Sequence, residues 1–303
     1  METGSRERSI FTPPDSHENH ERCVTCGEPI AAPFCGHCGE QRASDRSHSL
    51  FEFLKDHVVA PIANFDGRVI RTFRTLLVKP GELTRQFMRG SRLPYLAPLQ
   101  LFLLCNLAFF IWSGATKSRI LDTPLRAHVR GMAYSEKASA MVLDHLQRTK
   151  EEEKVYSARF DAVGSAQAKS LVIVMVPVFA LFVGGLTLVL RRRRPFVQHL
   201  VFAFHTYSWF FLCLIVSIYV LYLPLTFVLG KLHVAQGMYG YDAEYSVVML
   251  TAFSIYMAVA FRRTYDLPRV WAAVAAVASV LGAGVIILQA YRALLFFVTF
   301  YST

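Results

Sequence analysis

The stretch SLVIVMVPVFALFVGGLTLVL, residues 170–190, decides the fold class of this 303-residue chain. It carries no charged side chain over its whole length. A helix needs about 20 apolar residues to cross the hydrocarbon core of a bilayer. Because lipid offers no hydrogen bonds to the backbone, a single apolar segment crosses it as a helix. The stretch therefore predicts a membrane-spanning helix.

Similar apolar stretches occur before and after this one. Together they predict spans at about 96–115, 170–190, 199–224, 245–261 and 270–291. The third stretch stays apolar as far as residue 230, and we expect its helix to bend or end near Pro224. Charged residues make up only 18% of the chain, whereas soluble domains carry about 25%. The predicted fold class is an all-α polytopic membrane protein with about five transmembrane helices, whose bundle occupies residues 96–303.

Basic residues flank the predicted spans on one side. They precede the first span, form the run Arg191 to Arg194 after the second, and separate the fourth span from the fifth. Cytoplasmic flanks of membrane proteins are enriched in arginine and lysine, and the first 45 residues contain no signal peptide. We therefore expect a cytoplasmic N-terminus and an extracytoplasmic C-terminus. The charged segment 116–169, with helical character from about 124 to 160, would lie outside the membrane on the extracytoplasmic side.

Four of the six cysteines are concentrated in residues 21–42. Their spacing is C-x2-C-x8-C-x2-C, formed by Cys23, Cys26, Cys35 and Cys38. Two such pairs, each followed by glycine, supply the four thiolates of a closed tetrahedral zinc site. The sequence predicts a small N-terminal zinc ribbon with a structural zinc ion, preceded by a disordered tail at 1–20.

Other uses of these cysteines remain open. An iron site would employ the same four thiolates, and disulfides would require an oxidising compartment, which the expected cytoplasmic N-terminus does not provide. His37 lies between the third and fourth cysteines, and we interpret it as a solvated side chain. A redox role for the CxxC pairs is disfavoured because two matched pairs are typical of metal binding.

The juxtamembrane segment 49–95 contains short amphipathic helices with many basic residues. We expect these helices to break at Pro61, at Asp66-Gly67 and at Lys79-Pro80-Gly81. In the middle helix Arg68, Arg71 and Arg74 repeat every three residues, opposite an apolar side. Such basic amphipathic helices suit the membrane interface, so anionic lipid headgroups are expected partners.

The chain resembles a family of bacterial membrane proteins, the domain-of-unknown-function 3667 type. The resemblance is carried by the cysteine motif ending in FCGHCGEQR and by a KPGE…GxRxxYxxP signature. In this sequence that signature is Lys79-Pro80-Gly81-Glu82, Gly90, Arg92, Tyr95 and Pro98. The resemblance implies an N-terminal zinc ribbon, a juxtamembrane block, a multi-span region and a bacterial inner membrane. It brings no activity, substrate or catalytic residue.

Two groups of polar residues are candidate sites. Arg85, Arg89 and Arg92 could contact a phosphate, in a lipid headgroup, a nucleotide or a nucleic acid, or could simply set topology. His199 and His205 open the third span and could form an intramembrane polar site. Their spacing of six residues turns them to different helix faces, so we favour an interfacial His199 and an interhelical hydrogen bond for His205.

No motif of a known catalytic centre is present in the sequence. We find no phosphate-binding loop, dinucleotide fingerprint, zinc-protease motif or nucleophile elbow. The function we expect is that of a non-enzymatic scaffold or regulator, whose ribbon binds an unknown cytoplasmic protein. Nucleic acid is a weaker candidate partner. The alternatives are a transporter or lipid-handling permease, and a membrane enzyme acting on a lipid or phosphate substrate.

Overall fold

The computed structural model divides the chain into two compact units, Met1–Arg46 and Ser47–Thr303. The residues that it describes are 22–30, 33–40, 67–116, 121, 123–231 and 242–303. The predicted tail at 1–20 and the expected helix break at Pro61 lie outside these described residues.

Among its described residues, 22–30 and 33–40, the first unit has a very small apolar core. Its buried hydrophobic residues are Cys23, Ile30 and Cys35, with Cys38 packed against them. One antiparallel bridge pairs Arg22 with Pro29. Fixing the backbone of each residue costs about 1–2 kcal/mol of conformational entropy, and so small a core cannot offset that cost. Something besides apolar burial must stabilise this unit.

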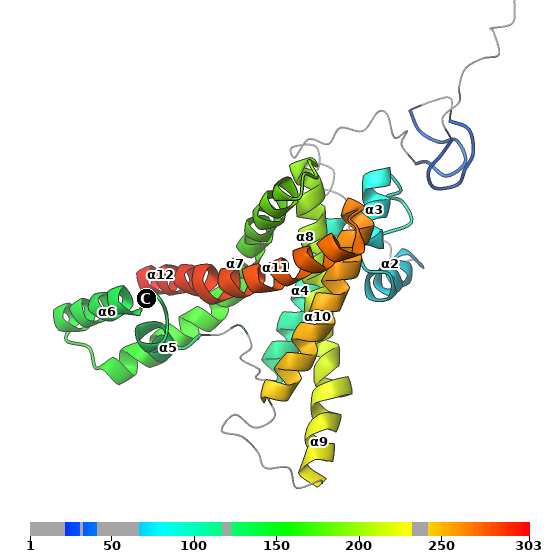
Figure 1. Ribbon diagram of the computed structural model, residues 1–303. Coiled ribbons are helices and arrows are strands. Elements are labelled where there is room, and N and C mark those ends of the chain that lie inside the picture. The colour runs from blue at the N-terminus through cyan, green and yellow to red at the C-terminus, as the bar shows by residue number, and fades with distance from the viewer. Residues whose placement is uncertain (1–21, 31–32, 41–66, 117–120, 122, 232–241) are drawn as a thin grey trace, which may run out of the picture. The chain divides into compact units, whose positions relative to one another are not determined.

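The second unit is all-helical over the residues that the structure describes (Figure 1). In chain order its elements are α2 (Gly67–Val78), α3 (Glu82–Arg89), α4 (Pro98–Thr116), α5 (Leu125–Arg130), α6 (Ser135–Thr149), α7 (Glu153–Val189), α8 (Phe196–Ser217), the π-helical turn η1 (Ile218–Tyr222), α9 (Leu223–Lys231), α10 (Asp242–Tyr265), α11 (Arg269–Val285), the π-helical turn η2 (Ile286–Tyr291) and α12 (Arg292–Ser302). The break between α2 and α3 falls at Lys79-Pro80-Gly81, as the sequence predicts.

Five helical stretches among the described residues are long and apolar enough to cross a membrane. They are Pro98–Thr116, Ser170–Val189, Phe196–Val228, Tyr245–Tyr265 and Arg269–Ser302. This finding confirms the predicted fold class, an all-α polytopic membrane protein. Length and composition alone identify these helices, because an apolar run longer than about 17 residues is long enough to span a bilayer.

The third span does not end at Pro224. The helix widens into the π-helical turn η1 just before the proline and continues as α9 to Lys231. Proline has no N–H to donate, and its ring crowds the carbonyl four residues earlier, here that of Val220. A wider turn at this point lets the helix pass the proline without breaking.

Helix α8 is the centre of the bundle. Every residue from Val197 to Trp209 is buried, so this half of α8 is enclosed on all sides. Stacked and tilted rings join it to α10, including Trp209 with Tyr256 at 4.0 Å between ring centroids. A helix that is enclosed all round must pair its polar side chains with other helices. This burial fixes the surroundings of both candidate histidines.

Helices α5, α6 and α12 pack on the first half of α7 around a second apolar cluster (Figure 1). The cluster consists of Leu125, Ala138, Val142, Tyr156, Phe160 and Phe296. Helix α7 has 37 residues, about 55 Å of helix, whereas the hydrocarbon core is about 30 Å thick. Its first half therefore extends beyond the span that begins at Ser170. Thr299 donates to Gln167 at 2.9 Å and holds α12 against this extension.

Candidate functional site

The four predicted cysteine ligands converge on one point. Their sulfur atoms all lie within 4.8 Å of one another, and two pairs, Cys23 with Cys38 and Cys26 with Cys35, are 3.5 Å apart. A metal–sulfur bond of about 2.3 Å gives tetrahedral sulfur–sulfur distances of about 3.8 Å, and a disulfide would need about 2.05 Å. The four free thiols thus form a cluster that could hold one metal ion.

Two turns of the same form build this cluster. In the first, the N–H of Cys23 donates to Glu28 at 2.7 Å and Gly27 donates back to Cys23 at 2.8 Å. The second turn repeats both bonds twelve residues later, from Cys35 to Glu40 and from Gly39 to Cys35. Both glycines have positive φ, 82° and 74°, which explains why glycine follows each CxxC pair.

The charges of the four sulfurs favour a bound cation. Burial raises the pKa of the Cys23 thiol, but hydrogen bonds from the backbone of Cys26 and Thr25 and with the sulfurs of Cys38 and Cys26 together lower it by more, to about 7. Burial and the neighbouring cysteine sulfurs raise the pKa of Cys38 to about 12. Four thiolates this close repel one another, so the thiols resist ionising together. A bound divalent cation reverses this and favours the ionised thiolates. His37 is exposed and stands outside the cluster.

A second candidate site is a cavity of about 260 Å³ in the helical unit. We call it the juxtamembrane cavity. Its polar lining residues are Arg68, Ser91, Arg92, Tyr95, Gln100 and His205. They come from α2, from the connection between α3 and α4, from the first turn of α4 and from α8. The remaining lining residues are apolar, and none of the described residues that line the cavity is acidic.

Hydrogen bonds between α2 and the connection before α4 position one wall of this cavity. Thr72 is fully buried; its hydroxyl donates to the Arg68 carbonyl at 2.7 Å and accepts from the N–H of Leu96 at 3.0 Å. Helix α3 ends at Gly90, whose φ of 97° reverses the chain. The guanidinium group of Arg92 lies 4.4 Å from the centre of the Phe87 ring.

The structure separates the three arginines that the sequence grouped as phosphate contacts. Of these, only Arg92 lines the juxtamembrane cavity. Arg85 forms an ion pair with Glu82 at 3.8 Å, and Arg89 is exposed. Arg68 lines the cavity instead, whereas the sequence pattern assigns it only to the basic side of an amphipathic helix. The polar Thr72 within the apolar side of α2 was the signal that this helix is tied to another segment.

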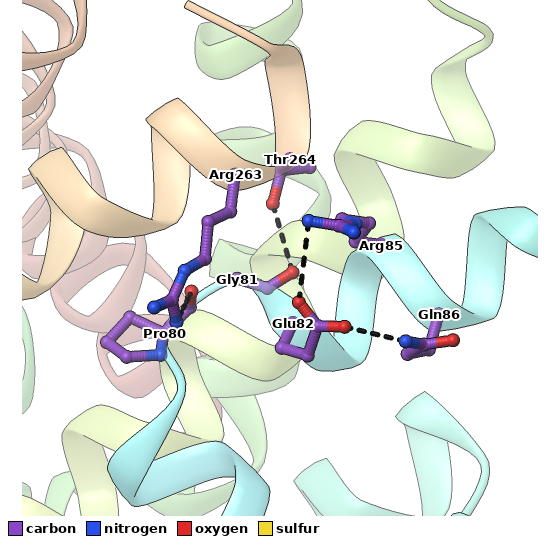
Figure 2. A network of polar contacts seen from close by, with 7 residues as sticks. All are labelled: Pro80, Gly81, Glu82, Arg85, Gln86, Arg263 and Thr264. Atoms are coloured by element: carbon purple, nitrogen blue, oxygen red, sulfur yellow. Dashed lines mark hydrogen bonds and ion pairs between the residues drawn. The ribbon is translucent and has the colours of Figure 1, made fainter. Parts of the chain in front are cut away.

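The KPGE turn docks onto α10 (Figure 2). Arg263 donates to the Pro80 carbonyl and Thr264 to the Gly81 carbonyl, both at 3.3 Å. On the other side of the turn, Glu82 accepts from Gln86 at 2.6 Å and pairs with Arg85. The signature therefore marks a joint between the juxtamembrane segment and the bundle, not only a helix start.

The two histidines of the third span have different partners. His205 Nδ1 lies 2.8 Å from the Thr84 hydroxyl, a buried hydrogen bond between α8 and α3. His199 Nδ1 lies 2.9 Å from the Tyr265 hydroxyl, and the two rings are stacked. The expected interhelical bond of His205 is present. His199 is buried because α10 ends beside it, and its interfacial position in the membrane stays a prediction.

Comparisons with known proteins identify only the juxtamembrane region. No curated protein and no solved structure matches the chain significantly. A family model described as a protein of unknown function (DUF3667) matches residues 66–110, which cover α2, α3 and the first part of α4. The match contains the KPGE turn and most of the juxtamembrane cavity, and it confirms that the chain is similar to this family of unknown function.

Proposed function

We propose that the protein is a membrane-anchored adaptor, in which a zinc-stabilised module recognises another protein and the helical bundle holds that module at the membrane. The convergence of four cysteine sulfurs within 4.8 Å carries this proposal. If one zinc ion is bound there, the chain fills all four of its coordination positions, and neither water nor substrate can reach the metal. Such an ion folds a module and does not catalyse a reaction.

The surface of the cysteine module supports a protein partner. Phe34, which is 59% exposed, directly precedes the second cysteine turn, and Val24, which is 42% exposed, lies within the first. Exposed aromatic side chains on a rigid turn are common anchors of protein interfaces. Residues 22–40 contain one arginine and two glutamates, whereas nucleic-acid sites are strongly basic. The partner that fits this surface is therefore a protein with an apolar contact patch.

The adaptor proposal is tested by chemical cross-linking of the full-length protein in the membranes of its native host. The informative variant is Phe34→Ser, which removes an exposed ring and leaves all four cysteines in place. Cys26→Ser removes a ligand, and His37→Ala serves as the matched control because His37 is exposed on the second turn. Cross-linked proteins are identified by mass spectrometry, and zinc is measured in each purified variant.

We expect one or more specific cross-links in the wild type and in His37→Ala, lost in both Phe34→Ser and Cys26→Ser. Zinc content should stay at the wild-type level in Phe34→Ser, which separates recognition from folding. Cross-links that survive in Cys26→Ser, in a chain that has lost its metal, would show that the module is not the recognition element. The proposal that the helical bundle anchors a recognition module at the membrane would then be wrong.

A further inference from the structure

Two arginine-rich loops of the helical unit lie side by side. One joins α7 to α8 through residues 190–195, and the other joins α10 to α11 through residues 266–268. Arg194 pairs with the Asp266 carboxylate at 3.3 Å, and Arg192 donates to the Asp266 carbonyl at 3.2 Å. We propose that these loops and the arginines that flank them, which we call the loop surface, bind the headgroup of an anionic phospholipid. The loop surface is separate from the cysteine module and does not depend on the adaptor proposal.

The lengths of the two loops place the loop surface at a membrane surface. The first loop connects the candidate spans Ser170–Val189 and Phe196–Val228, and the second connects Tyr245–Tyr265 and Arg269–Ser302. A loop this short extends at most about 10 Å out and back, so its side chains remain at headgroup depth. Trp271 is exposed near the start of the last of these spans, and tryptophan is enriched where a helix enters the headgroup layer.

The arginines of the loop surface divide into bonded and free side chains. Arg192 and Arg194 hold the two loops together, and Arg263 donates to the Pro80 carbonyl (Figure 2). The remaining arginines are exposed and form no hydrogen bond or ion pair with the residues that the structure describes. They are Arg191, Arg193, Arg262 and Arg269. Two free guanidinium groups therefore belong to the first loop and two flank the second, and each can donate to phosphate oxygens.

The loop surface has a large excess of positive charge. Residues 190–195 and 262–269 together contain seven arginines and one acidic residue, Asp266. The carboxylate of Asp266 is already paired with Arg194. Near an anionic bilayer each exposed arginine adds to the attraction, which falls off within a Debye length of about 10 Å. Anionic headgroups are therefore the partner that complements this charge at this depth.

The backbone holds the loop surface in one arrangement before a lipid binds. Arg191 and Asp266 have positive φ values, 57° and 53°, which residues other than glycine adopt only where their surroundings impose them. Gln198 in the first turn of α8 donates to the Thr264 carbonyl at the end of α10 at 3.1 Å, so the helices next to the loops are joined as well. Donors that are positioned in advance lose less conformational entropy on binding.

A purely topological role of these arginines predicts a different result. Basic residues that flank the spans set the orientation of a membrane protein, and the sequence pattern assigns the arginines only to that role. Selection of anionic lipid by the purified protein, which has already been inserted, separates binding from orientation. Arg126 and Arg130 supply a matched control, because both are exposed on α5 and neither belongs to the loop surface.

The experiment uses the purified full-length protein in a neutral detergent, and three double variants that each remove two positive charges. These are Arg191→Gln with Arg193→Gln, Arg262→Gln with Arg269→Gln, and the control Arg126→Gln with Arg130→Gln. Binding of phosphatidylglycerol is titrated by native mass spectrometry, with phosphatidylcholine for comparison. Poly-glutamate serves as a third probe, because it stands for an acidic protein segment. Thermal unfolding shows whether each variant folds.

We expect saturable binding of phosphatidylglycerol and none of phosphatidylcholine. Each loop variant should bind phosphatidylglycerol about tenfold to a hundredfold more weakly, because each lost charge weakens the attraction about fivefold. The control should stay within about twofold of the wild type. If a double variant does not fold, the single variants Arg193→Gln and Arg269→Gln, each with a loss of about fivefold, decide the outcome.

Three results would overturn the proposal. The first is wild-type protein that does not distinguish phosphatidylglycerol from phosphatidylcholine. The second is binding that is unchanged in either loop variant, or that weakens as much in the control as in the loop variants. The third is saturable binding of poly-glutamate without selective binding of lipid, which would assign the loop surface to an acidic protein segment.

Discussion

The Cα atom of Gly81 stands directly against the backbone of Ala260 in α10. A methyl group added to Gly81 would lie 2.7 Å from the Ala260 carbonyl oxygen, closer than carbon and oxygen atoms approach in proteins. Gly81 also has a φ of 77°, a conformation that other residues rarely adopt. Two independent constraints therefore require glycine at this position of the KPGE turn.

Gly81→Ala should destabilise the helical unit, because the new methyl group meets backbone that cannot rotate away. Overpacking of this kind costs about 1–3 kcal/mol, and the positive φ adds to it. Thermal unfolding of the detergent-solubilised protein measures the effect. Gly114→Ala is the control, since a methyl group at Gly114 meets nothing within 4 Å. Equal unfolding temperatures for the two variants would contradict the docking of this turn on α10.

Thr84→Val should weaken the joint between α3 and α8. The substitution keeps the shape of Thr84 and leaves His205 Nδ1 without its partner at 2.8 Å. A buried polar atom left unsatisfied costs about 1–3 kcal/mol. Thr84→Ser keeps the hydroxyl and should recover most of this loss in the same unfolding measurement. A Thr84→Ser variant as unstable as Thr84→Val would show that packing of the methyl group matters more than the hydrogen bond.

Metal removal should unfold the first unit and leave the second intact. The purified protein should contain one zinc ion per chain, and iron in its place would contradict the proposed cofactor. Cys38→Ser should reduce the zinc content to near zero, because loss of one of four thiolates opens the site. Proteolysis should then cleave residues 22–40 rapidly, while the unfolding temperature of the helical bundle stays at the wild-type value.

The helices around His128 should lose stability in weak acid. The pKa of His128 is lowered to about 4, mainly by burial; a backbone hydrogen bond to Thr123 opposes this shift and the charge of Arg292 adds to it. Its ordinary pKa is about 6.5. Above pH 6.5 the ring is neutral whether folded or unfolded, so it contributes no pH dependence. Between pH 6.5 and 4 only the unfolded form takes up the proton, and stability falls, by about 2 kcal/mol at pH 5.

Hydrogen exchange in residues 125–160, corrected for the intrinsic effect of pH, measures this loss. His128→Phe keeps a buried ring and removes the titration, so its exchange should change little between pH 7 and pH 5. In this variant the Tyr134 hydroxyl loses its 2.6 Å hydrogen bond to the imidazole, and this loss lowers the stability of the folded helices equally at both pH values. The same acid response in His128→Phe as in the wild type would assign the effect to another group.

The expected orientation is tested by cysteine labelling in intact cells. A cysteine introduced at Ala140 should react with a membrane-impermeant reagent, because segment 116–169 is expected on the extracytoplasmic side. A cysteine introduced at Arg193 should react only after the membrane is opened. The wild-type chain measures any background from its own cysteines. If the cysteine at position 140 reacts only after the membrane is opened, the orientation of the protein is the opposite of the expected one.

The spans and the clustering of the four cysteines could be predicted from the sequence because each depends on local information. The length of an apolar run alone decides whether it can span a bilayer. Two CxxC pairs each form a local turn, and these turns bring the four sulfurs together. The docking of the KPGE turn could not be predicted in this way. Thr264, which bonds Gly81, lies 183 residues further along the chain, and a single sequence does not show which distant helix will cover a turn.

The sequence also could not predict that Arg68 is the arginine of α2 that lines the cavity. A step of three residues leaves an offset of about 60° on an α-helix, so Arg68 and Arg74 lie about 120° apart around α2. Only one of them can face the bundle, and which one depends on where Thr72 finds its partner. The pattern identifies a basic helix, and only the tertiary contacts decide which of its charges lines the cavity.

The joint between the KPGE turn and α10 has a consequence for biosynthesis. Bacterial and eukaryotic ribosomes add about 5–20 residues per second, so about 10 to 40 s separate the synthesis of Gly81 from that of Thr264. During this interval α3 has no α10 to dock on, although its own sequence is complete. Although α3 precedes all five spans in the chain, its contact with α10 forms only after α10 has been made. A ribosome that stalls before α10 leaves the KPGE turn without its partner helix.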